Sequence, residues 1–232
     1  MLLTGAVGIL ALFYFQGWLV LSEPDPRRYP VRGIDISHHQ GRVAWGRLAA
    51  QRVRFVYLKA SEGQDWTDPL FAANTAAAPK KGIALGAYHY FTLCAPGRMQ
   101  AANFIRAAAG APLSLPPAVD VEYVGNCAAR PPRAAFTREL LAFLAQVKAK
   151  FGTAPLIYST QSFFDDYLSG PEFASCPFWV RSLTGEAGWS KGRRVLFRQF
   201  ADHARYDGLS GPVDVDVFIG SEADFAALMR AR

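Results

Sequence analysis

The sequence predicts one α/β domain, a closed barrel of eight strands, over residues 32–232. Three observations predict this fold class. Apolar, strand-like runs alternate with segments of helical periodicity as far as residue 159, and three more strand-like runs follow with mostly irregular connections. The chain has 232 residues, of which 51% are hydrophobic, enough for one domain of barrel size. Five βα units followed by three strands favour a closed, parallel-type barrel over an open doubly wound sheet.

The expected strands are short, apolar runs bounded by turn residues. They cover residues 33–36, 54–60, 83–91, 118–122, 155–159, 178–181, 195–200 and 213–218. Helices are expected where apolar residues recur at helical spacing or alanine is frequent. They cover residues 43–52, 69–80, 97–109 and 137–150, and Gly152 is a stop signal for the last of these.

Residues 2–21 form an almost uninterrupted apolar segment. About 20 helical residues cover the ~30 Å hydrocarbon core of a bilayer. No Lys or Arg precedes the segment, and Leu-Val-Leu at 19–21 offers no small-residue cleavage site. We therefore expect residues 1–22 to be an uncleaved signal anchor, with a cleaved signal peptide as the alternative. Pro24, Pro26 and Pro30 predict a stiff spacer over residues 23–31.

The formal net charge of +6 favours polyanionic surroundings. The arginines are dispersed, without the basic runs or base-stacking platforms of a nucleic-acid binder, so no nucleic-acid partner is expected. An anionic cell-wall polymer or a lipid surface fits this charge better.

The three cysteines, Cys94, Cys127 and Cys176, match no zinc-binding template. Cys94 and Cys127 each follow a predicted strand by a few residues, so both are expected in loops at one end of the sheet. In an exported protein these two form a disulfide and leave Cys176 free. Three separate thiols are the alternative.

The fourth strand ends in Asp120-Val121-Glu122. Residues at i and i+2 of a strand point to the same face, with Cα atoms roughly 6.6 Å apart. Two carboxyls this close raise each other's pKa, so that one stays protonated near neutral pH. Cleavage of a glycosidic bond needs such an acid and a second carboxylate. A strand end with solvated or arginine-paired acids is the alternative.

Asp35 and Asp214 are two further acids expected at the carboxyl ends of strands. In barrels of this kind the chemistry gathers at those ends. Mutual repulsion among four converging carboxylates is tolerated mainly where shifted pKa values are used.

Taken together, these and other short motifs resemble glycoside hydrolase family 25, the Chalaropsis-type lysozymes or N-acetylmuramidases. The match is distributed in order over residues 32–222. It comprises Gly33-Ile34-Asp35-Ile36-Ser37 with Gln40, Lys59-Ala60-Ser61-Glu62-Gly63, Gly86-Ala87-Tyr88-His89-Tyr90-Phe91, Asp120-Val121-Glu122, Tyr158-Ser159, Phe178-Trp179-Val180, Gln199-Phe200 and Val213-Asp214-Val215-Asp216-Val217-Phe218.

The resemblance implies a flattened (β/α)5(β)3 barrel. It implies hydrolysis of the β-1,4 bond between N-acetylmuramic acid and N-acetylglucosamine in peptidoglycan. It places Glu122 as the general acid, Asp120 as its partner carboxylate, and Asp35 and Asp214 as the two further acids.

Two residues depart from the family pattern: Arg198 stands where the family often has tryptophan, and Asp216 where it often has asparagine.

Tyr88, Tyr158 and Trp179 are candidates for stacking on sugar faces, and Gln199 for contacting substrate. Their alternative role is in the core. The adjacent histidines His38 and His39 diverge on an extended chain, so we predict no metal site, and nothing in the sequence calls for a cofactor.

The predicted protein is therefore an exported peptidoglycan hydrolase of the bacterial cell envelope, membrane-anchored or secreted. Its expected partners are glycan strands and, through the N-terminal segment, the membrane. A non-catalytic wall-binding module and a glucosaminidase are the alternatives. Four retained acids argue against the module, because a binder gains nothing from their repulsion.

Overall fold

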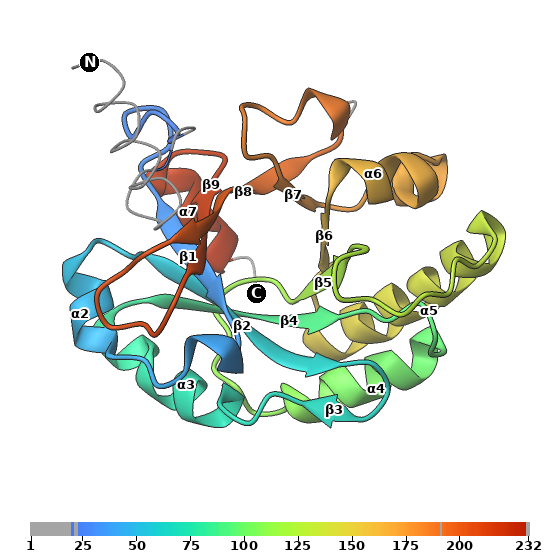
Figure 1. The fold of residues 1–232 in the computed structure, drawn as a ribbon, viewed down its shortest axis with the longest axis horizontal. Coiled ribbons are helices and arrows are strands. Elements are labelled where there is room, and N and C mark those ends of the chain that lie inside the picture. Colours follow the sequence, from blue (N-terminus) through green and yellow to red (C-terminus); the bar gives the residue numbers. More distant parts are fainter. Residues whose placement is uncertain (1–19, 21–22, 191, 231–232) are drawn as a thin grey trace, which may run out of the picture.

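A computed structural model describes residue 20 and residues 23–190 and 192–230 of the chain. In this part of the chain eight strands close into a barrel, with a ninth short strand on its rim (Figure 1). The barrel strands are β1 (Arg32–Ile36), β2 (Phe55–Glu62), β4 (Ala84–Tyr90), β5 (Ala118–Val121), β6 (Leu156–Ser159), β7 (Phe178–Arg181), β8 (Val195–Ala204) and β9 (Val213–Phe218). The short β3 (Trp66–Thr67) pairs only with the end of β2.

The order of the strands around the barrel is β1-β9-β8-β7-β6-β5-β4-β2, and pairing of β1 with β2 closes it. The predicted closed barrel is therefore confirmed. Every pairing from β1–β2 round to β7–β8 is parallel, as expected. The last strand differs, because β9 runs antiparallel to both β8 and β1.

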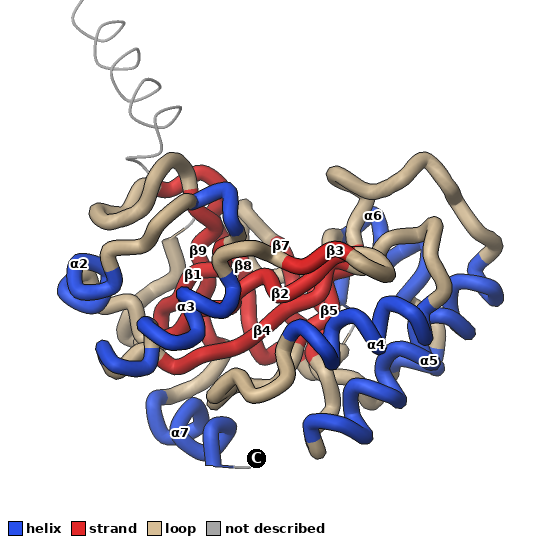
Figure 2. The backbone as a smooth tube through the Cα atoms, turned by 90° about the horizontal axis from the view of Figure 1, so that it is seen from below, coloured by secondary structure: helices blue, strands red, loops and turns tan. Residues whose placement is uncertain are grey.

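Helices lie along the outside of part of the barrel, and α4 and α5 lie side by side (Figure 2). They are α2 (Trp45–Ala50), α3 (Phe71–Ala77), α4 (Gly97–Ala107), α5 (Arg133–Phe151), α6 (Gln161–Phe163) and α7 (Glu222–Arg230), with short 3-10 or π turns between some of them. All four predicted helices are present, and Gly152, with φ of 74°, ends α5. The structure adds β3, α6 and α7, which the sequence analysis did not delimit.

Strand alternation divides the apolar residues into two cores. Along each strand, one residue points outward toward the helices and loops, and the next points into the barrel interior. Phe55, Tyr57 and Phe197 pack inside the barrel, and Phe225 of α7 packs against Phe55. This packing fills one end of the barrel with apolar side chains.

Two inward-facing glycines make room for the large interior rings. A Cβ added to Gly33 would lie 2.4 Å from the Phe55 ring, and one added to Gly86 would lie 2.2 Å from the Tyr57 ring. Both glycines belong to motifs singled out in the sequence. Their role is packing inside the barrel.

Toward the other end the interior changes from apolar to polar. Along β2, Phe55 and Tyr57 are followed on the same face by Lys59, and along β5, Ala118 is followed by Asp120. A barrel filled at one end and polar at the other presents a single site at its polar mouth.

The predicted signal anchor over residues 1–22 lies, apart from Val20, outside the described residues. Within the described part of the chain, no helix has the length and apolar character needed to cross a bilayer.

Candidate active site

A cleft of about 210 Å³ opens at the polar mouth of the barrel. Its walls contain all four predicted acids, Asp35, Asp120, Glu122 and Asp214, and the four predicted substrate contacts, Tyr88, Tyr158, Trp179 and Gln199. Eight residues spread over 180 positions of sequence are thus brought to one place, and each comes from a barrel strand or the residue directly after it.

Asp120 lies on β5, and Glu122 is the first residue after that strand. Asp35 lies near the carboxyl end of β1. Asp214 reaches the same mouth differently from the prediction, since it is the second residue of β9 and not near its carboxyl end. Because β9 is antiparallel, its beginning lies beside the end of β1, and Asp214 pairs directly with Asp35.

Burial raises the pKa of Glu122 to about 7, although the positive charges of Arg181 and Lys59 oppose this shift. Burial also raises the pKa of Asp120 well above its usual range, and the charges of Glu122 and Asp35 raise it further. Ionising both carboxyls of this pair is costly, so the pair retains a proton near neutral pH. Asp120 Oδ1 is buried without a hydrogen-bond partner among the described residues.

The two further acids are shifted in the same direction. Burial and the charges of Asp35, Asp202 and Glu122 raise the pKa of Asp214 to about 9 against the opposing Arg181. Burial and the charge of Asp216 raise the pKa of Asp35 well above its usual range. The cleft therefore holds several carboxyls that are not all ionised at neutral pH.

Three of the predicted substrate contacts also hold the acids in place. The Tyr158 hydroxyl donates to Gln199 Oε1 at 2.9 Å, and Gln199 Nε2 donates to Asp35 Oδ2 at 3.0 Å. Trp179 Nε1 donates to Asp216 Oδ1 at 2.8 Å. Trp179 is 2% exposed, so little of its ring is available for stacking.

The cleft also contains groups that the sequence analysis did not assign to the site. Lys59 Nζ pairs with Glu62 at 2.6 Å and lies 4.8 Å from the ring centre of Tyr90 and 5.2 Å from that of Trp66. Lys59 and Tyr90 line the cleft, whereas Trp66 is 37% exposed beside Lys59. A signal for both was present in the sequence, because residues two apart on a strand share a face. Lys59 therefore lies on the inner face with Tyr57, and Tyr90 lies on it with Tyr88.

The histidines of the motifs have separate surroundings. His89 faces away from the barrel interior, where Ser61 Oγ lies 2.8 Å from Nδ1 and Gln100 Oε1 lies 3.1 Å from Nε2. Burial lowers the pKa of His89 to about 3. His38 Nδ1 lies 3.2 Å from Asp68. Among the described residues no group of three or more His, Cys, Asp and Glu side chains is arranged to bind a metal.

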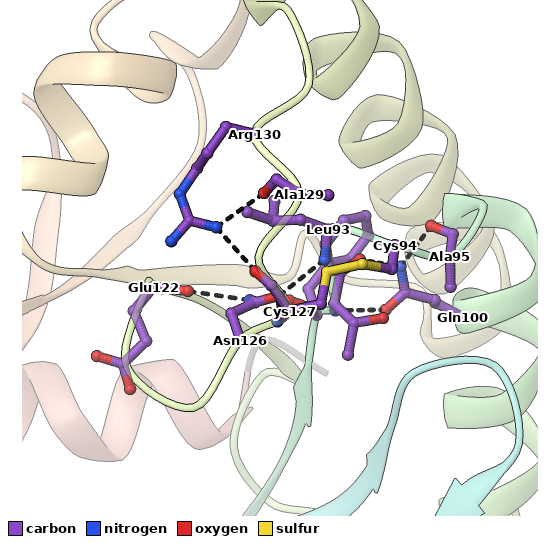
Figure 3. Close-up of a disulfide and its surroundings, with 11 residues drawn as sticks. Leu93, Cys94, Ala95, Gln100, Glu122, Asn126, Cys127, Ala129 and Arg130 are labelled. Atoms are coloured by element: carbon purple, nitrogen blue, oxygen red, sulfur yellow. Dashed lines mark hydrogen bonds between the residues drawn. A yellow bond between two sulfur atoms is a disulfide. The ribbon is translucent and has the colours of Figure 1, made fainter.

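A disulfide joins Cys94 to Cys127, as predicted, and Cys176 is free. It joins the loop that follows Glu122 to the loop that follows β4 (Figure 3). In the same loop Asn126 Nδ2 donates to the backbone oxygens of Glu122 and Phe91, at 3.0 and 2.9 Å. The Glu122 carboxylate points away from these contacts (Figure 3), so its backbone is held while its side chain remains available to the cleft.

Removing the disulfide is expected to destabilise the protein. The two cysteines are 33 residues apart in sequence, and a loop of that size corresponds to about 3–4 kcal/mol of unfolding free energy. Denaturant unfolding of the Cys94→Ala/Cys127→Ala variant measures this loss, and Cys176→Ala is the control. An unchanged unfolding free energy in the double variant would contradict the role assigned to the bond.

A carboxyl that keeps its proton near neutral pH beside a second carboxyl, in a cleft at the mouth of a barrel, has the chemistry of an enzyme that hydrolyses glycosidic bonds. The family model "Glycosyl hydrolases family 25" matches residues 34–209. The chain therefore belongs to glycosyl hydrolase family 25 and is a glycoside hydrolase, as the sequence motifs predicted.

Similar proteins agree with this assignment. An uncharacterized protein of Escherichia coli K12, YegX, is 32% identical, covering 97% of this chain and 84% of its own. Lysozyme M1 of Streptomyces globisporus is 29% identical, covering 85% of this chain and 71% of its own. The structure of a family 25 glycosyl hydrolase from Bacillus anthracis superposes with a TM-score of 0.80 at 31% identity, covering 89% of this chain and 96% of that one.

Proposed function

We propose that this glycoside hydrolase is a lysozyme. It cleaves the β-1,4 bond between N-acetylmuramic acid and N-acetylglucosamine in peptidoglycan. The observation that carries the proposal is the Asp120 and Glu122 pair, which retains a proton near neutral pH at the mouth of the barrel. The similarity to a protein named lysozyme M1, from Streptomyces globisporus, supports peptidoglycan as the substrate.

In the proposed mechanism Glu122 protonates the glycosidic oxygen as the bond breaks. It is suited to this role because its pKa of about 7 keeps a substantial fraction protonated at neutral pH. When the proton of the pair is on Glu122, Asp120 is the charged member, and its negative charge stabilises the positive charge that develops on the sugar or on an oxazolinium formed by the substrate's own acetamido group. Asp35 and Asp214 complete the carboxyl lining of the cleft.

Substrate contacts are proposed for Tyr88, Tyr158, Trp179 and Gln199, all of which line the cleft. These side chains are nearly buried, so each presents an edge or a polar tip to the glycan and not a full ring face. Trp66, with its larger exposed area beside Lys59, is the better stacking surface at the rim.

We further propose that the protein acts on the cell wall outside the cytoplasm. The Cys94–Cys127 disulfide supports an oxidising compartment. In this proposal residues 1–22 direct export and anchor or release the protein, residues 23–31 act as a spacer, and residues 32–232 form the hydrolase domain.

Analysis of the newly formed reducing ends tests this function. Purified peptidoglycan is digested, the new ends are reduced with borohydride, and the amino sugars are identified after hydrolysis. The proposal predicts that the wild-type protein produces reduced muramic acid. The Glu122→Gln variant, used as the control, should produce none above the background of undigested peptidoglycan. Reduced glucosamine would identify a glucosaminidase instead, and no new reducing end together with retained wall binding would identify a binding module.

A further inference from the structure

Trp66 presents an aromatic ring to solvent beside the cleft. The described residues include four exposed large hydrophobic side chains, and Trp66, which is 37% exposed, is the aromatic one among them. Leaving part of a large ring in water forgoes the free energy of burying it. Trp66 lies on β3, which pairs with the end of β2, and Lys59 of β2 lines the cleft. The exposed ring is therefore a neighbour of the site.

The backbone that carries Trp66 is held by a buried amide. Asn103 of α4 is 0% exposed, and its Nδ2 donates to the backbone oxygens of Trp66, Gly63 and Glu62 at 2.9, 3.0 and 3.2 Å. Arg106 Nη2 donates to Asn103 Oδ1 at 2.8 Å, which fixes the orientation of the amide. The turn from β2 to β3 is thus tied to α4, and the Trp66 ring is held at the surface.

Two histidine rings join the Trp66 ring to the cleft. The ring centre of His38 lies 5.2 Å from that of Trp66 and 4.0 Å from that of His39. His39 is exposed and lines the cleft, as does Lys59, whose Nζ lies 5.2 Å from the Trp66 ring centre. The rings of Trp66, His38 and His39, called here the rim aromatics, therefore form a row that is continuous with the cleft.

A buried carboxyl anchors the middle ring of this row. The Asp68 side chain is 2% exposed, and its Oδ2 accepts from the His38 backbone N–H at 2.7 Å and lies 3.2 Å from His38 Nδ1. Its Oδ1 accepts from the Leu70 backbone N–H at 2.8 Å. Ser37 Oγ accepts from the His39 backbone N–H at 3.3 Å. The rings are thus placed before a ligand arrives, which lowers the entropic cost of binding one.

We propose that the rim aromatics bind a sugar of the glycan strand beyond the sugars on which the acids act. A sugar ring has C–H groups on its faces and hydroxyls at its edge. The faces fit an aromatic surface, and the hydroxyls fit histidine ring nitrogens and the Lys59 ammonium. Trp66 and His39 contact this distal sugar, and His38 is a positioning residue between them.

Continuity with the cleft identifies the ligand as the glycan strand itself. A polymer that passes the acids and is longer than the cleft has to cross its rim. Where it does so at His39 and Lys59, the rim aromatics are the next surface that it meets. This inference rests on the proposed function for the identity of the ligand, a peptidoglycan glycan strand, and not for its cleavage.

Binding of glycans of two lengths tests the distal contact without relying on hydrolysis. The probes are a disaccharide and an octasaccharide of peptidoglycan without peptides, and their Kd values are measured by NMR titration. The full chain carries Glu122→Gln throughout, so that the probes stay intact. Trp66→Ala and Trp66→Phe are added to this background. Leu141→Ala, which truncates a side chain of 38% exposure on α5 and outside the cleft lining, is the matched control.

A distal contact predicts that the octasaccharide binds more tightly than the disaccharide. Trp66→Ala should then weaken octasaccharide binding by roughly 2- to 10-fold, the range of one aromatic contact, and leave the Kd of the disaccharide unchanged. Trp66→Phe should keep part of the lost affinity, and Leu141→Ala all of it.

An unchanged octasaccharide Kd in Trp66→Ala, or an equal loss in Leu141→Ala, would overturn the proposal. An equal loss for both probes would place Trp66 against the sugars in the cleft and overturn the distal position. The predicted binding together with a wild type that does not hydrolyse peptidoglycan would reject the proposed function and leave the glycan contact standing.

Discussion

Glu122→Gln is expected to lose at least ~100-fold in the rate of peptidoglycan hydrolysis, the lower range of what a general acid contributes. Glutamine has the same shape but no proton to give to the glycosidic oxygen. The main-chain hydrogen bond from Asn126 remains, so the loop is expected to keep its position. Steady-state kinetics on soluble peptidoglycan fragments should show the loss in kcat with little change in KM.

Glu222→Gln is the matched control for this variant. Glu222 is an exposed residue at the start of α7, where it pairs with Arg54 away from the cleft. The Glu222→Gln variant should retain wild-type kinetics. A Glu122→Gln enzyme with near-normal kcat would remove Glu122 from the role of acid.

Asp120→Asn is expected to reduce kcat by a similar factor of at least ~100, the scale on which preorganised electrostatic stabilisation acts in active sites. The variant lacks the negative charge that faces the developing positive charge of the sugar. Asparagine fills the same space, so the loss is chemical and not steric.

Stability separates this catalytic role from a structural one. The pKa of Asp120 is raised in the folded protein, so its contribution to stability falls as pH rises above the ordinary aspartate pKa. Removing the ionisable group should therefore leave the variant at least as stable as the wild type at pH 7. A variant that loses activity and unfolds more easily in denaturant would indicate a structural role instead.

The number, order and approximate bounds of the barrel strands were predictable because buried strands form distinct apolar runs. The bounds of β7 were predicted to the residue. The direction of β9 was not predicted, because parallel and antiparallel strands share one periodicity. In the structure only residues 205–212 separate β8 from β9, too few for a parallel crossover, which needs a dozen or more. The predicted strands left residues 201–212 between them, so this signal was not visible in the sequence.

Helix α7 was missed although its start carries a recognisable signal. Ser221 Oγ accepts from the Asp224 backbone N–H, and Asp224 Oδ2 accepts from the Ser221 backbone N–H, which is a capping box. The helix is short, and its buried residue Phe225 packs into the far end of the barrel.

The sequence predicted which residues belong to the candidate site better than it predicted the hydrogen bonds between them. The motifs identified the four acids, and the strand pattern placed them near the mouth. The bonds from Tyr158 to Gln199, from Gln199 to Asp35 and from Trp179 to Asp216 join different strands, so they depend on barrel closure and register. Local sequence patterns do not contain that information.

The pH dependence of kcat/KM for the full chain tests the central claim most directly. A protonated Glu122 is required, so the rate should fall as pH rises through an apparent pKa of about 7. Arg181→Met should move this limb to higher pH, because the positive charge of Arg181 lowers the pKa of Glu122. A rate that stays constant or rises from pH 6 to well above this value, in wild type and variant alike, would contradict the assignment of a proton-donating acid to this cleft.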